Sequence, residues 1–484
     1  MSSLFSSSSS SPASSSTASL SADDRRTLKG LIVAVLAMQL LTPFLQSGVA
    51  VLLPAMGRTF SCSATELGLV STVYCMALAI FNLAMGRAGD KWGRRKVCLA
   101  SAVILAPTVA LMGLVPNIES VIGLRFFQGM GTAAFCTSSL AMLVACSPPA
   151  MRGRLLGITS TGVYVGVSIG PLIGGYVNVL WGWKIFFWGI SLWAMFCFVI
   201  MLLLVRREWY ESPELPYDWT GLVLFAASMI VIVQGCAGSM PDRYRPLVLL
   251  AGLVLSVVFL VWEYRLKTTM PLLDIRVLIH NRLFVLSNLA SFSLYASLFS
   301  LTFFYSLYLQ FARGMNSDLA GTVIFLQPVV QVLFTMPGGW LSDRIGPEPV
   351  ALTGNVFAVA SLVLALFLDG ASPMWFITLI LVLNGMGMAL FVTPNTVMIM
   401  TSVDPAHMSQ ASGLVGTGRT AGMLLSMVIA TFCLRLTMGD AVPGPENSAS
   451  LISAMHMSFM VFCVLCSVSF LCSILRMGRF VTGR

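Results

Sequence analysis

The chain has 484 residues, of which 57% are hydrophobic and only 10% are charged, and its formal net charge is +9. Soluble domains average roughly 45–50% apolar and about 25% charged residues, so this composition excludes an ordinary soluble protein and predicts a membrane protein. In a soluble chain the positive charge would suggest a nucleic-acid partner. In a membrane protein an excess of Lys and Arg instead marks the cytoplasmic loops, so no nucleic-acid partner is expected.

The N-terminal stretch 1–28 is rich in serine and is expected to be a disordered tail, without the basic start and apolar core of a signal peptide. Beyond it, fourteen stretches are long and apolar enough to cross a hydrocarbon core about 30 Å thick. They lie near residues 31–53, 65–85, 97–115, 119–145, 155–178, 183–205, 218–238, 246–264, 283–311, 316–341, 348–368, 373–400, 410–436 and 451–475.

Charged joints after the sixth and eighth spans divide the chain. They predict an all-α integral membrane fold with six-helix bundles at 29–207 and 283–476, two inserted helices with their joints at 208–282, and a tail at 477–484. With a cytoplasmic N-terminus, cytoplasmic segments carry 20 of the 28 Lys and Arg residues and outer segments carry 6. This bias places both chain ends in the cytoplasm. The chain is therefore expected to be a multi-pass protein of the cell membrane, by analogy a bacterial inner membrane.

Two loops carry one pattern. The stretch GRAGDKWGRRK at 86–96 and the stretch GWLSDRIGPEP at 339–349 both read Gly, three residues, Asp, a basic residue, one residue, Gly. Each follows the second helix of a six-helix block. Internal repeats of this kind are typical of secondary transporters, whose substrate site lies at the interface of the repeats.

The sequence resembles the major facilitator superfamily, in its fourteen-helix branch of drug/proton antiporters of the multidrug efflux type. The resemblance rests on the 86–96 loop, on LRFFQGMGTAA in the fourth span, on GVYVGVSIGPLIGG in the fifth, on ASGLVGTGRTAGMLLSMVIA in the thirteenth, and on the joint that begins WEYR. It covers roughly residues 30–475, and it departs from the family loop motif at Arg87 and Gly89. It implies export of small molecules by alternating access, without a cofactor.

The resemblance assigns a switching role to the repeated loop, which in this family holds the two halves together in the outward-facing state. The residues implied are Gly86, Asp90, Gly93, Arg94, Arg95, Gly339, Asp343 and Arg344. Anchoring to the anionic inner leaflet is the alternative for the basic residues, and it explains Arg87 and Lys96 equally well.

The fifth span carries glycines at a period of four, and residues four apart share one face of a helix. The motif comprises Gly162, Gly166, Gly170, Pro171, Gly174 and Gly175. Close packing of a second helix is one interpretation of this smooth strip. A sealing or sliding surface during alternating access is the other, and the G-P-x-x-G-G ending favours it through its likeness to the antiporter signature.

Proton coupling is the point at which the sequence departs from its relatives, which carry an acid where Gln46 stands. None of the 19 acids is expected near the middle of a helix. Either Glu66 near Arg125 couples transport to protons, or coupling is weak or absent. Arg125 and Gln128 lie in the fourth span, where the arginine either reaches outward or faces the cavity. Arg419, about 14 Å from the inner end of its span, is expected to be a cavity or coupling residue.

The walls of the expected cavity are apolar and aromatic with a few polar points, which suits amphipathic organic substrates. The candidates for this cavity are Tyr295, Tyr305, Gln327, Gln331, Asn384 and Asn395. Packing against lipid is the alternative for each aromatic residue. Embedded arginines without a nearby acid should disfavour lipophilic cations and tolerate anions or neutral molecules. Both arginines also match positions of the family that the sequence resembles, so a structural role is the alternative.

An enzyme is not expected, because the three histidines form no metal-spaced cluster and no nucleotide-binding loop occurs. The first hypothesis is a monomeric exporter of amphipathic drugs or toxic metabolites that works by proton antiport in the lipid bilayer. The alternative is a specific exporter of an organic anion or other metabolite with altered or absent proton coupling. The third hypothesis is a sensor or scaffold that has the transporter fold but does not transport. Neither a cofactor nor a metal is expected.

Overall fold

The computed structural model describes residues 22–146, 149–210, 214, 216–237, 241–266, 271–272, 281–403, 408–439 and 441–482. Within these residues the secondary structure is helical, without a strand, and the expected all-α membrane fold is confirmed. Helix α1 begins at Ala22, inside the stretch expected to be a tail. Residues 1–21 of that stretch lie outside the described part of the chain.

Fourteen helical spans follow one another in the described residues. The first eight are α1 (Ala22–Phe60), α2 (Ala64–Trp92), α3 (Arg94–Leu111), α4 (Ile118–Cys146), α5 (Pro149–Trp181), α6 (Trp183–Leu204), α7 (Trp219–Ala237) and α8 (Arg245–Arg265). The other six are a combined span of α10 (Arg282–Leu298), α11 (Leu301–Leu307) and the π-turn η2 (Tyr308–Ala312), then α12 (Ser317–Ile345), α13 (Pro347–Ala365), α14 (Met374–Thr401), α15 (Met408–Met438) and α16 (Ser448–Thr482).

Twelve of these spans are, over the described residues, long and apolar enough to cross a membrane. The remaining two are α3, which begins with three basic residues, and α4, which contains Glu119 and Arg125. Both pack inside the same bundle as their apolar neighbours. Both helices therefore belong to the first bundle.

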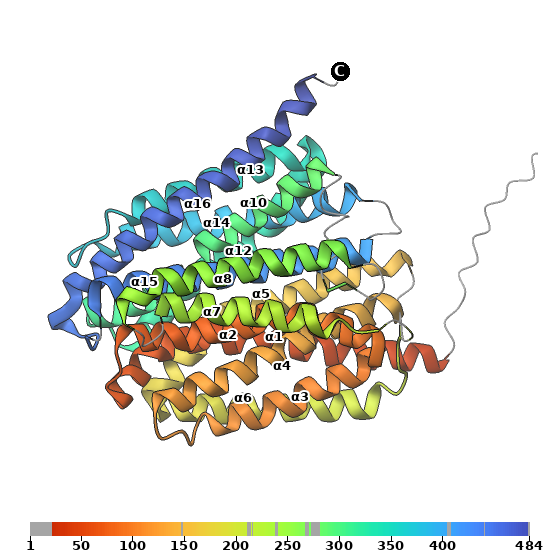
Figure 1. The fold of residues 1–484 in the computed structure, drawn as a ribbon, viewed down its shortest axis with the longest axis horizontal. Helices are drawn as coiled ribbons and strands as arrows, with labels where there is room; N and C mark the ends of the chain where they lie inside the picture. The colour runs from red at the N-terminus through yellow and green to blue at the C-terminus, as the bar shows by residue number, and fades with distance from the viewer. Residues whose placement is uncertain are drawn as a thin grey trace, which may run out of the picture.

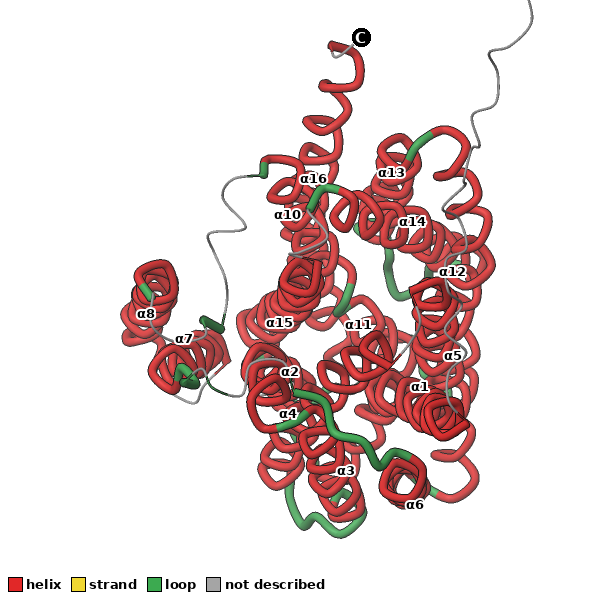
Figure 2. Tube along the Cα trace, turned by 90° about the vertical axis from the view of Figure 1, so that its right-hand side faces the viewer, coloured by secondary structure: helices red, strands yellow, loops and turns green. Residues whose placement is uncertain are grey.

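The spans form two bundles, which Figure 1 shows as layers of nearly parallel helices. Helices α1 to α6 pack in the first bundle and α10 to α16 in the second. The bundles meet where α2 lies beside α15 and α5 beside α12, and the α7–α8 hairpin lies outside against α2 and α15 (Figure 2). Both ends of the described chain lie on one side (Figure 1). We call this side the basic face, because the α2–α3 loop with Arg94, Arg95 and Lys96 lies there, and the other side the opposite face.

The span expected as one helix over 283–311 is interrupted after α10. The backbone N–H of Ser300 donates to the Ser426 hydroxyl on α15 at 3.0 Å, and the two hydroxyls lie 2.9 Å apart. The span ends in the π-turn η2, a form that is rare outside single-turn irregularities. A side chain on a distant helix causes the break at Ser300, so the local sequence alone did not predict it.

Candidate functional site: the interface between the bundles

Hydrogen bonds join α2 to α15 near the opposite face. Thr65 Oγ1 donates to the carbonyl of Gly439 at 3.1 Å, and the hydroxyls of Thr72 and Thr431 lie 2.8 Å apart. Between these contacts, a Cβ added to Gly68 would lie 2.6 Å from the Thr431 hydroxyl. The absence of a side chain at Gly68 therefore lets the two bundles touch.

A second close contact joins α5 to α12 at the same face. Asn178 Nδ2 donates to Ser317 Oγ at 2.7 Å, and Ser317 Oγ donates to the Gly175 carbonyl at 3.4 Å. A Cβ on Gly321 would lie 2.3 Å from the carbonyl oxygen of Pro171, and one on Gly175 would lie 2.3 Å from that of Ser317. Two residues of the fifth-span motif, Pro171 and Gly175, thus lie at the contact between the bundles.

The other glycines of this motif face α1 inside the first bundle. These are Gly162, Gly166, Gly170 and Gly174. A Cβ on Gly166 would lie 2.4 Å from the carbonyl oxygen of Leu40, and one on Gly170 would lie 2.8 Å from that of Phe44. The strip with a period of four therefore packs α5 on α1, while the adjoining residues contact α12.

A third contact at the opposite face involves η2. Gln310 Nε2 donates to the Val51 carbonyl of α1 at 2.9 Å and to the Ser306 hydroxyl at 3.1 Å. The guanidinium of Arg58 lies over the ring of Phe311, 5.5 Å from its centroid. Three helix pairs thus close the opposite face.

Toward the basic face the two bundles separate. A Cβ on Gly413, on the side of α15 that meets α2, would meet no atom within 4 Å, and Arg419 is exposed. A long contact of 3.5 Å links Asn82 Nδ2 of α2 to Thr420 Oγ1 of α15. The structure is therefore sealed at the opposite face and open beside α15 toward the basic face.

Arg419 lies in the middle of this interface among neutral side chains. It is within electrostatic range of Cys136 on α4 and Tyr164 on α5, both in the other bundle. In its own bundle, Tyr295 Cβ lies 3.1 Å from the place of a Cβ on Gly422, one turn from Arg419. We call Cys136, Tyr164, Tyr295 and Arg419 the central cluster. Tyr295 and Arg419 were expected here from the sequence, whereas Tyr164, which lies between Gly162 and Gly166 of the fifth span, was not.

Arg125 occupies a different environment, because it is only 1% exposed. Its Nε donates to the Val70 carbonyl at 3.2 Å, and its Nη1 donates to Gln128 Oε1 at 3.1 Å. Its guanidinium lies over the Tyr74 ring, 4.2 Å from the centroid. The charge of Arg125 is thus held inside the first bundle by a carbonyl, an amide and a ring.

The acidic residues of the described chain all lie within about one turn of a helix end or outside the helices. Glu66 forms a capping box at the start of α2, where Ser63 N donates to Glu66 Oε2 at 2.7 Å. Among the hydrogen bonds and ion pairs of the described residues, none joins Glu66 to Arg125. Gln46 is half-buried on α1.

The polar cavity candidates of the second bundle differ in burial. Gln327 is half-buried, whereas Gln331 and Asn384 are buried. The Nδ2 of Asn384 and the hydroxyl of Tyr305 have no hydrogen-bond partner among the described residues. Buried polar atoms of this kind are uncommon, because losing hydration without a partner costs free energy.

Asn395 belongs to a polar network inside the second bundle. Its Oδ1 accepts from Arg476 Nη1 at 2.5 Å, and its Nδ2 donates to the Ser287 carbonyl at 3.1 Å. Arg476 also donates to the hydroxyls of Ser287 and Ser473. Asn395 is therefore bonded between α10, α14 and α16, and its role in a substrate cavity stays a prediction.

The two loops of the repeated pattern share one backbone conformation at their last glycine. Gly93 and Gly346 follow α2 and α12 with φ of +110° and +92°, a region that favours glycine. Their N–H groups donate to the carbonyls of Gly89 and Ser342, each at 3.0 Å. The last glycine of each pattern thus ends its helix in the same way.

The α2–α3 loop is held by an ion pair of its own and by the joint between α6 and α7. Asp90 Oδ1 and Arg94 Nη2 form an ion pair of 2.7 Å. Arg94 N donates to the Trp209 carbonyl at 3.0 Å, and Arg95 N donates to Glu208 Oε1 at 2.7 Å. In this conformation the Asp90–Arg94 pair joins the end of α2 to the start of α3.

Aromatic residues of the joint between α6 and α7 cover this loop, a feature that the sequence analysis did not single out. Trp92 stacks on Tyr217 with ring centroids 5.3 Å apart, and Tyr217 lies 4.8 Å from Trp219. The Tyr217 hydroxyl donates to the Ala84 carbonyl at 3.0 Å. The cluster of Trp and Tyr in 208–219 was the available signal, but such clusters also mark membrane interfaces.

The corresponding loop of the second bundle makes fewer contacts with its surroundings among the described residues. Asp343 and Arg344 are exposed, and the Arg344 guanidinium stacks 3.8 Å from the centroid of Trp340. A Cβ on Gly339 would meet no atom within 4 Å, and one on Gly86 would approach side-chain atoms no closer than 4.0 Å. These first glycines of the pattern are therefore not held by close packing in this conformation.

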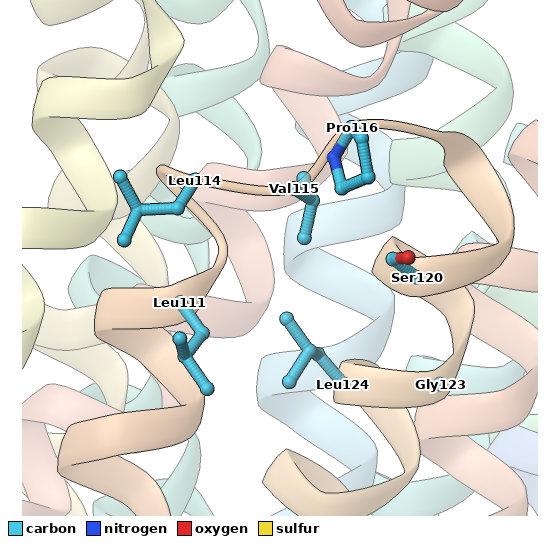
Figure 3. Close-up of a pocket in the computed structure, with 7 residues that line it drawn as sticks. All are labelled: Leu111, Leu114, Val115, Pro116, Ser120, Gly123 and Leu124. Atoms are coloured by element: carbon cyan, nitrogen blue, oxygen red, sulfur yellow. The ribbon is translucent and has the colours of Figure 1, made fainter.

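Two hollows lie at the opposite-face ends of α3 and α4. One of about 360 Å³ is lined by Leu111, Leu114, Val115, Pro116, Ser120, Gly123 and Leu124 (Figure 3). The other, of similar volume, is more polar and includes Cys62, Glu66 and Glu119. Neither contains a residue of the central cluster, so we assign the substrate to neither.

The fold and the interface define a class of protein, a multi-pass helical membrane protein of two six-helix bundles that meet around a polar centre. The family model described as Major Facilitator Superfamily matches residues 35–218 and 288–480. The chain therefore belongs to the Major Facilitator Superfamily and is a transporter, not an enzyme.

Two curated relatives are similar over most of their length. The riboflavin transporter RibZ of Clostridioides difficile is 24% identical over 430 residues, which cover 88% of this chain and 92% of RibZ. The Tetracenomycin C resistance and export protein of Streptomyces glaucescens is 27% identical over 411 residues, which cover 83% of this chain and 75% of that protein. The expected relationship to efflux transporters is thereby confirmed.

A solved structure supports the fold. The inward-facing, unoccupied bacterial homolog of the human lysosomal transporter Spinster aligns with a TM-score of 0.66 at 16% identity, covering 92% of this chain and 97% of that chain. At this identity the likeness extends to the fold alone. It agrees with the arrangement of two bundles described above.

Proposed function

We propose that this chain is a secondary active exporter of amphipathic small molecules that works by alternating access, with protons as the counter-substrate. The observation that carries the proposal is the asymmetric interface. It is closed at the opposite face by contacts such as Thr72 with Thr431, and it is open toward the basic face beside Gly413. The two relatives are named for the transport or export of organic molecules, which supports an organic substrate here.

In this proposal the substrate enters the interface from the basic face and reaches the central cluster. The α2–α15 and α5–α12 contacts then part while the basic-face loops close. The loop that contains Asp90 and Arg94 is the proposed latch of the closed basic face, together with Asp343 and Arg344. Rocking of this kind needs helix pairs that separate and re-form without side-chain rearrangement, and the glycines at the α2–α15 and α5–α12 contacts supply such pairs.

Transport in everted vesicles tests the proposal. An imposed gradient that is acid inside should drive accumulation of an amphipathic dye, and an ionophore that dissipates the gradient should abolish it. Vesicles without the chain are the control. Absence of flux for every dye tested would refute export.

A second candidate is a specific metabolite exporter with altered or absent proton coupling. The observation that favours it is the location of the described acids at helix ends, with Gln46 in the first span and Glu66 engaged in a cap. Glutamine cannot exchange a proton in the physiological range. Flux that is unchanged when the gradient is dissipated would support this candidate over proton antiport.

A further inference from the structure

The position of Arg419 sets the starting point. It lies 11 residues into the 31-residue helix α15, about 16 Å from its start at a rise of about 1.5 Å per residue. A charged side chain at such a depth is unfavourable in lipid and usually faces a water-filled path or a partner. Arg419 is exposed and lies at the interface of the bundles, so it faces the path that is open toward the basic face.

The surroundings of Arg419 do not neutralise its charge. The groups described around it are Cys136, Tyr164 and Tyr295, and the polar contact beside it joins Asn82 to Thr420. All of these are neutral at physiological pH. No carboxylate of the described residues lies within ion-pair distance of Arg419.

Arg125 provides an internal comparison. Its guanidinium is buried and is already bound by the Val70 carbonyl, the Gln128 amide and the Tyr74 ring. The guanidinium of Arg419, in contrast, is accessible and can donate its hydrogen bonds to a ligand. Guanidinium groups bind oxyanions such as carboxylates and phosphates through two parallel hydrogen bonds, and they repel cations.

We propose that the transported substrates are aromatic organic anions, whose anionic group binds Arg419 while their ring packs beside Tyr164 and Tyr295. The proposal rests on the proposed function, because it names the substrate class of the same pathway. Tyr164 comes from α5 of the first bundle and Tyr295 from α10 of the second, so a molecule at this point contacts both bundles. Arg419 selects its charge.

Three probes with one ring system test the proposal: naphthalene-2-sulfonate, the neutral naphthalene-2-sulfonamide and 2-naphthyl-trimethylammonium. Binding to the purified full chain and flux into everted vesicles are measured separately. We expect the sulfonate to bind at least about tenfold more tightly than the ammonium probe, as expected for one charge-assisted hydrogen-bonding group. Arg419→Gln should lower the ratio of sulfonate to sulfonamide affinity at least about tenfold, and Arg419→Lys should retain most of it.

Arg435→Gln is the matched control, because it removes the same charge from the same helix about 24 Å away. It should leave the charge preference unchanged. Binding that depends on Arg419 without flux would support the substrate class and refute export. Flux without charge preference, or with a preference for the ammonium probe, would overturn the substrate class and leave export standing. Absence of both binding and flux for all three probes would overturn the substrate class and export together. If a variant does not fold, the charge preference of the wild type alone tests the substrate class.

Discussion

Replacing Gly321 by alanine should weaken the seal between α5 and α12. The added Cβ would lie 2.3 Å from the carbonyl oxygen of Pro171, whereas ordinary contacts begin near 3.4 Å. The helices must therefore separate by about 1.1 Å locally, since a backbone carbonyl cannot rotate away as a flexible side chain can. The same substitution does little harm to a helix by itself, because alanine favours helix over glycine.

The magnitude follows from the cost of overpacking. Forcing extra atoms into a close-packed contact costs about 1–3 kcal/mol, which would shift the equilibrium toward the state with this contact open by about 5- to 150-fold. Hydrogen–deuterium exchange of the full chain in lipid nanodiscs measures this shift. We expect amides at the opposite-face ends of α5 and α12 to exchange faster by a factor in that range, because exchange follows local opening.

Gly189→Ala is the control for this experiment. Gly189 lies in α6, and a Cβ there would meet no atom within 4 Å. Exchange in α5 and α12 should stay unchanged in this variant. Equal exchange in Gly321→Ala and the wild type would refute the inference that this contact seals the opposite face.

Two further predictions concern coupling and thiol chemistry. Under the second candidate function, in which wild-type flux does not depend on the proton gradient, Gln46→Asp should make flux depend on it, since the variant introduces a titratable group in the first span. Flux assayed across a range of pH checks this, with Gln46→Asn as control, and an unchanged pH profile would count against the role of this position. Burial, with the carboxylates of Glu66 and Glu119 nearby, raises the pKa of the Cys62 thiol to about 12. The thiol therefore stays protonated at pH 8, with roughly a thousandfold less thiolate than an ordinary cysteine of pKa about 8.5. Mass spectrometry after treatment with an impermeant maleimide should find Cys62 largely unlabelled, and labelling as fast as that of free glutathione would contradict this.

The sequence predicted the helices well, because each span needs about 20 apolar residues and such runs stand out in a chain with so few charges. It also predicted the repeated loops, since Gly93 and Gly346 end their helices through the same backbone geometry. Periodicity further identified the glycine strip of the fifth span. It did not reveal that Gly170 meets α1 while Gly175 meets α12, because a period defines a face and not its partner.

The features of the site that the sequence did not predict depend on contacts between segments that are distant in the chain. The stacking of Trp92 on Tyr217 joins residues 125 positions apart, and hydropathy carries no signal for such a pair. The sequence favoured Arg419 as a cavity or coupling residue, but it left open whether Arg125 reaches outward or faces the cavity. Only the structure separates the buried arginine, bound by Tyr74 and Gln128, from the exposed one at the interface. In the same way, the sequence could not show that Asn395 is bonded to Arg476 of α16.

Distances between the bundles at both faces test the central claim of alternating access most directly. Spin labels are placed at Lys96 and Ile345 near the basic face, and in a second sample at Leu114 and Trp375 near the opposite face, after replacement of the 11 native cysteines. The distance between the two labels in each sample is measured by double electron–electron resonance, with and without a transported probe and a proton gradient. We expect the basic-face distance to shorten in the same conditions in which the opposite-face distance lengthens. Two distances that stay fixed, or that change together in one direction, would contradict the account.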